Sequence, residues 1–258
     1  MRRECVRYRV VFVLALVIAM AFALAACGSS EEASVETEPA AETTSSSEAT
    51  QAAEEEEVED LSLLYQGHAS LRIVTDDGKV IYIDPYAGDG YDLPADLILV
   101  THDHYDHNAL DLIKTRNDDC QVIPQNEALA DRTFDLGYVT VEATEAGNNQ
   151  NHSIDECVGY VLTFADGKSL YVTGDTSTTN QMSQLADKNI DYAFFCCDGV
   201  YNMDLDEAAK CAELVQAKHN IPYHIGEAEN PDHFDTARAE KFDAPNKMIL
   251  EPGDEITL

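Results

Sequence analysis

One short segment gathers three imidazoles and a carboxylate directly after an apolar run at residues 97–100. His102 and His104 are two residues apart, so in an extended segment both side chains face the same way and can bind one metal ion. Asp106 and His107 follow at a turn, where adjacent side chains can point towards a second ion. A solvated, histidine-rich loop is the alternative, but it gives no reason for this density of ligand types. The segment therefore predicts a metal centre.

The elements that must position this segment alternate between β-hairpins and strand–loop–helix units. Turn sequences that contain Asp-Gly separate apolar runs at residues 76–79 and 165–168, which predicts two hairpins. The expected strands span residues 61–65, 70–75, 80–83, 97–100, 121–123, 139–141, 157–164, 169–173 and 192–196. The expected helices span residues 109–116, 127–131, 181–188, 205–218 and 236–242. This order predicts a mixed α/β sandwich.

The His-x-His-x-Asp-His pattern at residues 102–107 resembles the signature of the metallo-β-lactamase superfamily, and the match continues in order from residue 61 to about residue 225. His152 precedes a predicted strand, as the third histidine of the family's first metal site does. Asp175 lies in a Gly-Asp-Thr loop similar to the one that carries the family's bridging aspartate. His224 ends a segment similar to the one that supplies the last histidine of the second site. The resemblance implies an αββα sandwich of two mixed β-sheets flanked by helices.

The resemblance also implies two sets of metal ligands. These are His102, His104 and His152 for the first ion, Asp106, His107 and His224 for the second, and Asp175 as a bridge between the two. Imidazole and carboxylate ligands without thiolate suit two Zn²⁺ ions, and Fe or Mn is also admissible. A redox di-iron protein is disfavoured, because the branch of the family with that chemistry has a carboxylate in place of His104.

Two ions held by these ligands would promote hydrolysis. A shared carboxylate would hold them about 3.5–4 Å apart, and a water between them would ionise near neutral pH, because bound zinc alone lowers the pKa of water to about 7. Asp106 can both ligate the second ion and orient the hydroxide, so it is the expected catalytic residue. The hydroxide would attack the carbonyl or phosphoryl centre of a small-molecule lactone, ester, amide or phosphodiester.

Three short motifs are most similar to the ascorbate-6-phosphate lactonase-like branch of metal-dependent hydrolases. They are Gly67-His68-Ala69-Ser70, Ile83-Asp84-Pro85 and Gly174-Asp175-Thr176. Asp84, in the second motif, is expected to organise a loop that supports the histidine cluster.

Three further side chains are candidate substrate contacts. His68 follows a predicted strand and could line the pocket or donate a hydrogen bond to a metal ligand, although a purely structural histidine fits its position equally well. Tyr201 and Asn202 follow another predicted strand, where α/β sheets place their ligand-binding loops. The alternative for this second loop is a simple turn made by Asp198 and Gly199.

Residues 1–26 have the pattern of a lipoprotein signal peptide. Four arginines precede an apolar run of about 17 residues, which ends in Leu-Ala-Ala-Cys-Gly and so resembles the lipobox of bacterial lipoproteins. Cleavage there would leave Cys27 as a lipid-modified N-terminus and would anchor the protein, outside the cytoplasm, to a bacterial membrane. An uncleaved transmembrane helix is the alternative, since the run is at the short edge of a membrane span.

An acidic segment continues from Cys27 to residue 60. Residues 28–60 contain 12 acidic residues, no Lys or Arg and hardly any apolar side chain, which predicts a disordered linker. The domain expected at residues 61–258 has 36 acidic and 12 basic residues, a net charge of −24. Such a surface repels phosphate backbones, so we expect no nucleic-acid partner. Its five cysteines are an odd number, which argues against a complete disulfide framework.

Together these features predict a metal-dependent hydrolase that acts on a small molecule and contacts the membrane only through its lipid anchor. A metal- or ligand-binding lipoprotein without turnover is the alternative, and the complete ligand set with Asp106 favours the enzyme. A processing nuclease of the same superfamily is disfavoured by the lack of a basic patch. No pattern in the sequence specifies the substrate or the oligomeric state.

Overall fold

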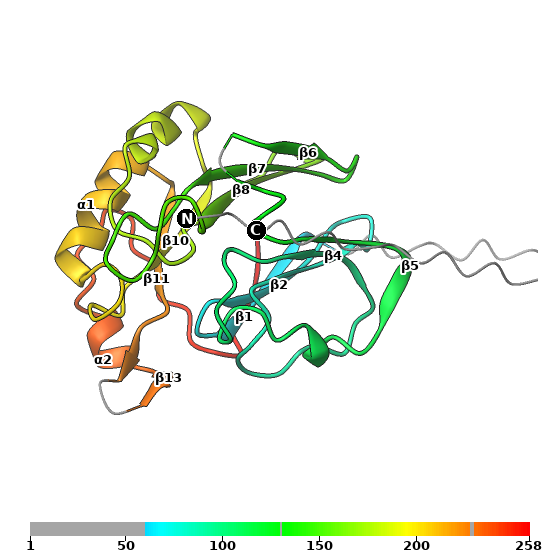
Figure 1. Cartoon of the computed structure of the whole chain (residues 1–258), viewed down its shortest axis with the longest axis horizontal. Helices are drawn as coiled ribbons and strands as arrows, with labels where there is room; N and C mark the ends of the chain where they lie inside the picture. Colours follow the sequence, from blue (N-terminus) through cyan, green and yellow to red (C-terminus); the bar gives the residue numbers. More distant parts are fainter. Residues whose placement is uncertain (1–59, 130, 228–229) are drawn as a thin grey trace, which may run out of the picture. The chain divides into compact units, whose positions relative to one another are not determined.

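A computed structural model of the chain describes residues 60–258, apart from residues 130 and 228–229. These residues form two six-stranded β-sheets and a two-stranded ribbon (Figure 1). The predicted signal peptide, Cys27 and acidic linker lie outside the described residues. Among the helices of the described part, none is long and apolar enough to cross a membrane.

The first sheet has the strand order β14-β1-β2-β3-β4-β5. Its strands are β1 (Ser62–Gly67), β2 (Ser70–Val74), β3 (Val80–Ile83), β4 (Ala95–Leu99), β5 (Arg116–Ile123) and β14 (Glu255–Thr257). The neighbours from β14 to β3 are antiparallel, whereas β3, β4 and β5 are parallel. The first three predicted strands, at residues 61–65, 70–75 and 80–83, are present as the antiparallel run β1-β2-β3, and β14 pairs with β1 at the edge of that run.

The second sheet has the order β11-β10-β9-β8-β7-β6. Its strands are β6 (Thr133–Asp135), β7 (Val139–Glu145), β8 (Val158–Phe164), β9 (Ser169–Val172), β10 (Tyr192–Cys196) and β11 (His219–Tyr223). Strands β6 to β9 are antiparallel, and β9, β10 and β11 are parallel. Both sheets are therefore mixed, as predicted. The separate ribbon pairs β12 (Gly226–Glu227) with β13 (Asn230–Phe234).

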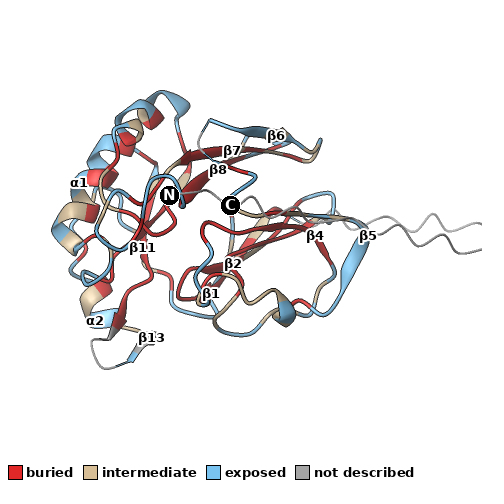
Figure 2. Ribbon diagram, in the orientation of Figure 1, coloured by how far each residue is buried: buried red, intermediate tan, exposed pale blue. Residues whose placement is uncertain are grey.

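Side-chain alternation on β4 separates two hydrophobic clusters. Leu97 and Leu99 belong to the main core, which contains side chains from both sheets, while Ile98 between them belongs to a smaller cluster. Because successive strand residues point to opposite faces, the main core lies between the sheets and the smaller cluster covers the other face of the first sheet. Figure 2 shows buried residues concentrated along the strands of both sheets.

Helices pack mainly on the second sheet. The helix α1 (Leu205–Val215) begins at Asp204, whose side chain accepts a hydrogen bond from the Glu207 N–H and so caps the helix. It lies on the side of β10 and β11 that faces away from the first sheet (Figure 1). The helix η2 (Gln181–Lys188) contacts α1, and the short α2 (Thr236–Ala239) follows β13. Helix α1 ends before residue 218, the predicted end, because Gln216 adopts a left-handed conformation and β11 begins at His219.

Two predicted helices are wrong. The region 109–116 contains only the 3₁₀ helix η1 (Leu110–Leu112), because Arg116 pairs with Ala95 and must be extended. Among the described residues of 127–131 there is no helix either. A backbone turn, in which the Ala128 N–H donates to the carbonyls of residues 124 and 125, occupies this region. A short segment gains little stability from helical backbone hydrogen bonds alone. Contacts with the rest of the protein therefore determine whether it forms a helix.

The parallel strands of both sheets lead into the loops that carry the candidate ligands. The carboxyl ends of parallel strands are the edge at which α/β sheets place their ligands. Asp84 follows β3, the segment 101–107 follows β4, and Asp175, Asp198 and His224 follow β9, β10 and β11.

Candidate metal centre

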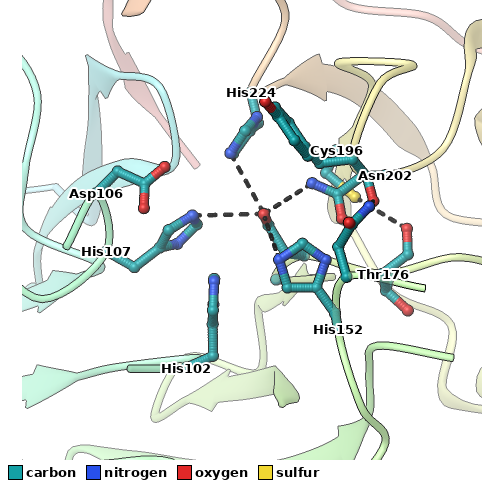
Figure 3. A network of polar contacts seen from close by, with 12 residues as sticks. His102, Asp106, His107, His152, Thr176, Cys196, Asn202 and His224 are labelled. Atoms are coloured by element: carbon teal, nitrogen blue, oxygen red, sulfur yellow. Dashed lines mark hydrogen bonds and ion pairs between the residues drawn. The ribbon is translucent and has the colours of Figure 1, made fainter. Parts of the chain in front are cut away.

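The structure brings all seven predicted metal ligands together. Ligand atoms within 4.8 Å of one another form three overlapping groups: His102, His104 and His152; His68, Asp106, His107 and His224; and His102, His107 and Asp175. Figure 3 shows the rings of His102, His107, His152 and His224 converging, with Asp106 to one side. The two ligand sets implied by the family resemblance are thus two adjacent groups in space.

Asp175 lies between the two groups, and its two carboxylate oxygens face different histidines. Its Oδ1 lies 3.5 Å from His107 Nε2 and 3.4 Å from His224 Nε2, and its Oδ2 lies 3.4 Å from His152 Nε2. This is the orientation that a carboxylate bridging two ions requires. Gly174, directly before it, has φ +62° and no room for a Cβ atom, so the entry into this loop depends on glycine.

Several of the ligand atoms are buried without a hydrogen-bond partner. They are His102 Nε2, His107 Nε2, His224 Nε2 and Asp175 Oδ1. An unsatisfied buried polar atom costs roughly 1–3 kcal/mol, so four of them in one place need a compensating interaction. Metal ions would supply it, and the residues present therefore fit a metal centre.

The protonation of the histidines is consistent with this fit. Burial and the neighbouring imidazoles lower the pKa of His102 to about 2, and burial also lowers the pKa of His152. The neutral imidazole is the form that ligates metal. For His107, burial acts in the same direction, but the carboxylates of Asp175 and Asp84 overcome it and raise its pKa to about 9. A cation bound at His107 would replace that proton.

The surroundings of Asp175 and Asp106 favour the ionised form of both carboxyl groups. Burial would raise the pKa of Asp175, but the surrounding imidazoles outweigh it and hold this pKa well below its usual range. The same balance applies to Asp106, where burial is outweighed by the hydrogen bond and charge of His68 and by the charge of His107. Ionised carboxylates are the form that ligates and bridges metal ions.

Asp84 contacts the imidazole ring of His107 at Nδ1, the nitrogen that does not face Asp175. It is fully buried, and its Oδ2 lies 2.8 Å from His107 Nδ1. The Thr101 N–H donates to Asp84 Oδ1 at 2.7 Å, and the Thr101 hydroxyl donates to Oδ2 at 2.6 Å. The predicted loop organiser is therefore a residue that orients one specific ligand, so that His107 Nε2 faces Asp175.

The loop after β10 contacts Asp175 through Asn202, an interaction that the sequence did not predict. Asn202 Nδ2 donates to Asp175 Oδ2 and to Asp198 Oδ2, at 2.7 Å each, so both of its amide hydrogens are engaged within the protein. Asp198 Oδ1 in turn accepts from the backbone N–H of Tyr201 at 2.6 Å. Only the position of Asp198 at a strand end hinted at this role. The Tyr201 side chain remains exposed, as a substrate contact requires.

His68 differs from the other two candidate substrate contacts. Its side chain is only 2 % exposed, and its Nε2 lies 3.3 Å from Asp106 Oδ2. Its ring centroid lies 3.8 Å from that of His224. The structure places His68 inside the cluster of predicted ligands.

A family model for the beta-lactamase superfamily domain matches residues 62–224 of the chain. The chain belongs to the metallo-β-lactamase superfamily. A UPF0173 metal-dependent hydrolase from Geobacillus sp. (strain WCH70) is 28% identical to it over 239 residues, covering 77% of this chain and 100% of the relative.

Two solved structures extend the similarity to this metallo-β-lactamase domain. A protein from Parabacteroides distasonis, described provisionally as a metal-dependent hydrolase, has a TM-score of 0.62 at 30% identity, covering 73% of this chain and 92% of that one. The metallo hydrolase Igni18 from Ignicoccus hospitalis has a TM-score of 0.61 at 22% identity, with coverages of 78% and 99%, and shares the fold. The predicted sandwich of two mixed sheets is confirmed.

Proposed function

We propose that this protein is a binuclear metal-dependent hydrolase of small molecules. The observation that carries the proposal is Asp175, whose two oxygens face separate histidine groups at the meeting point of two sheets. The relatives named metal-dependent hydrolases support the reaction class. When bound, two divalent ions, with Zn²⁺ favoured and Fe or Mn admissible, would supply a hydroxide at neutral pH and polarise the scissile carbonyl or phosphoryl group.

The residues of the chain have distinct tasks in this proposal. The first ion is assigned to His102, His104 and His152, and the second to Asp106, His107 and His224, with Asp175 shared. Asp106 keeps 21 % of its side chain exposed, against 5 % for Asp175, so it is the more accessible carboxylate. We assign it the proton of the attacking water, because an ionised carboxylate at the open side of the centre can accept it.

The loops around the centre favour an uncharged substrate with an apolar part. Four large hydrophobic side chains are exposed on the loops that carry candidate ligands: Tyr105, Ile154, Val200 and Tyr201. Beside Ile154, a hollow of about 550 Å³ is lined mainly by polar side chains, at residues 148–154 and Glu156, and it includes His152, so it suits the polar part of such a substrate. Segments 101–109, 147–157 and 198–204 contain no Lys or Arg, and the cation that approaches them at Gly199 is Arg238 from α2, so these loops themselves offer little attraction to a remote phosphate or carboxylate. Among the predicted substrates, neutral lactones, esters and amides fit best.

We also propose that the chain is part of the ascorbate-6-phosphate lactonase-like branch, on the three short motifs that contain His68, Asp84 and Asp175. Membership of a branch concerns descent and leaves the substrate open. A panel of neutral and phosphorylated lactones, chromogenic esters, β-lactams and phosphodiesters would locate the substrate class.

The wild-type protein is expected to bind close to two metal ions, and chelation is expected to abolish hydrolysis. His102→Ala is expected to lose the first ion, because one of its three imidazoles is gone. Elemental analysis of the purified protein and of this variant, before and after chelation, checks both expectations. Protein that contains no transition metal when isolated, and takes up none on titration, contradicts the proposal. Full metal loading without turnover of any panel substrate supports a binding protein instead.

Tyr201→Ala is expected to raise the KM for neutral aryl or acyl substrates by about 10-fold, because the exposed ring loses its contact with the apolar part of the substrate. The matched control is Leu214→Ala, which removes a large exposed side chain from α1. Steady-state kinetics on both variants make the comparison. If the KM of Tyr201→Ala is unchanged for every active substrate, Tyr201 does not contact the substrate.

We further propose that the protein is an extracytoplasmic bacterial lipoprotein anchored through Cys27, on the strength of the lipobox-like sequence alone. Cys27→Ala is expected to abolish lipid labelling. The variant is also expected to be released from the membrane or mislocalised. Metabolic labelling with a fatty acid and membrane fractionation measure this. A variant that stays embedded like the wild type would mean that the apolar run is a transmembrane helix.

A further inference from the structure

We propose that His68 is a direct ligand of the second metal ion. The ion would then be held by His68, Asp106, His107 and His224, whose ligand atoms all lie within 4.8 Å of one another, with Asp175 approaching it from beside His107 and His224. The inference rests on the proposed two-ion centre and adds a ligand that the H-x-H-x-D-H pattern does not contain. It replaces the expectation that His68 contacts substrate.

The contact distances in the centre fall into two kinds. A charge-assisted hydrogen bond is about 2.7–2.9 Å long, and the pair His107 Nδ1 to Asp84 Oδ2, at 2.8 Å, is of that kind. Two neighbouring ligands of one ion, each bound at about 2.1 Å, lie roughly 3.0–3.4 Å apart for angles between about 90° and 110° at the ion. The three contacts of Asp175 with imidazoles are 3.4–3.5 Å long, close to this ligand–ligand separation. The distance from His68 Nε2 to Asp106 Oδ2, 3.3 Å, belongs with them.

Burial disfavours a substrate contact and a purely structural role for His68, and the ¹¹³Cd–¹⁵N coupling measurement below distinguishes a direct ligand from a hydrogen-bond donor to Asp106. A substrate contact must be accessible, but the His68 side chain is 2 % exposed. A structural histidine in a core normally has hydrogen bonds at its ring nitrogens, but Nδ1 of His68 is buried without one, and Nε2 has only the 3.3 Å contact with Asp106. A metal ion shared with its neighbours would satisfy Nε2.

The backbone holds His68 in this place from two sides. His68 has φ +50°, a conformation that is rare for a side chain of this size. Its carbonyl accepts from the Tyr65 hydroxyl at 3.0 Å and from the His224 N–H at 2.8 Å. The second bond ties His68 directly to a predicted ligand of the same ion. Such conformations persist where the surroundings enforce them, and they cluster at functional sites.

The added ligand raises the expected coordination number of the second ion. Three imidazoles and two carboxylates are five side-chain donors, more than a tetrahedral zinc site uses. The second ion would be five- or six-coordinate, a geometry that Mn²⁺, Fe²⁺ and Co²⁺ accept readily. Its coordination would be nearly filled by protein, so the exchangeable position would belong mainly to the first ion.

Titration with Co²⁺ tests the assignment without relying on activity. In His68→Gln and His68→Ala, the affinity for the second equivalent of Co²⁺ is expected to fall by about 10–100-fold or more. A loss of 10–100-fold is already seen when an indirect metal contact is removed. Both variants are expected to shift the visible spectrum of this second equivalent towards a lower coordination number. The first equivalent should be unchanged. His219→Gln is the matched control, because His219 stacks on Tyr192 outside the centre.

A second measurement needs no substitution. In wild-type protein loaded with ¹¹³Cd and labelled with ¹⁵N-histidine, six of the eight histidines should show metal–nitrogen coupling, and His219 and His233 should not. Coupling at only five, with His68 uncoupled, overturns the inference, as do two ions bound by His68→Gln with wild-type affinities and spectra. Uptake of a single ion by the wild type would instead overturn the two-ion centre on which the inference rests.

Discussion

Asp106→Asn is expected to lower turnover by about 10²–10⁴-fold, the usual share of a positioned proton acceptor. The substitution keeps the size of the side chain and one ligating oxygen but removes the charge and the acceptor. The fold should be unaffected, because Asp106 lies in a loop at the edge of the core and retains 21 % exposure. Kinetics measured alongside metal content separate lost chemistry from lost metal.

The neighbouring acid provides the control for this result. Asp103 is exposed in the same segment and accepts a hydrogen bond from Asn108, so Asp103→Asn removes the same charge from the same loop. It should change turnover by less than about 10-fold, since its carboxylate ligates nothing. Equal losses in both variants would indicate a general electrostatic effect. Unchanged hydrolysis by a fully metal-loaded Asp106→Asn protein would exclude Asp106 as the catalytic residue.

Asp84→Ala is expected to destabilise the protein by about 3–5 kcal/mol, because removing one partner of a buried charged network leaves the others uncompensated. The donors that lose their acceptor are the Thr101 N–H, the Thr101 hydroxyl and His107 Nδ1. Affinity for the second ion should also fall, by about 10–100-fold, since His107 would no longer be oriented. Urea unfolding of metal-free protein measures the first effect, and calorimetric metal titration measures the second.

Asp96→Ala separates the two effects. Asp96 is also buried and accepts hydrogen bonds from the Lys79 ammonium group and the Val80 N–H, but it lies near the start of β4, at the opposite end of that strand from the ligand segment. This control should lose stability and keep wild-type metal affinity. If Asp84→Ala also kept wild-type metal affinity, its contact with His107 would have no role in ligand orientation.

Patterns that are local in sequence were predicted well. The strands at 80–83 and 192–196 have the predicted bounds, because an apolar run between turn signals determines an extended segment without reference to the rest of the chain. The histidine-rich segment is equally local. Its placement after β4 followed from the general rule that ligand loops lie at the carboxyl ends of strands.

Features that depend on distant partners were missed. The pairing of β14 with β1 joins Ile256 to Leu63, and no pattern in either segment specifies the other. Arg116 is extended only because Ala95 offers it a strand edge. The roles of Asn202 and Asp198 depend on the position of Asp175, which is set by a different strand. Sequence periodicity contains no such long-range information.

The cluster of predicted ligands connects the two sheets, since the segment 101–107 leaves the first sheet and Asp175 and His224 leave the second. A metal ion bound there would favour the folded over the unfolded chain by thermodynamic linkage. The gain is RT ln(1 + [M]/Kd), about 2.7 kcal/mol at a free metal concentration 100 times the Kd. A change of that size alters the unfolded fraction that proteases can attack by about 100-fold. Proteases would then degrade the protein faster when free metal is scarce. Its abundance would therefore fall as the free metal concentration falls.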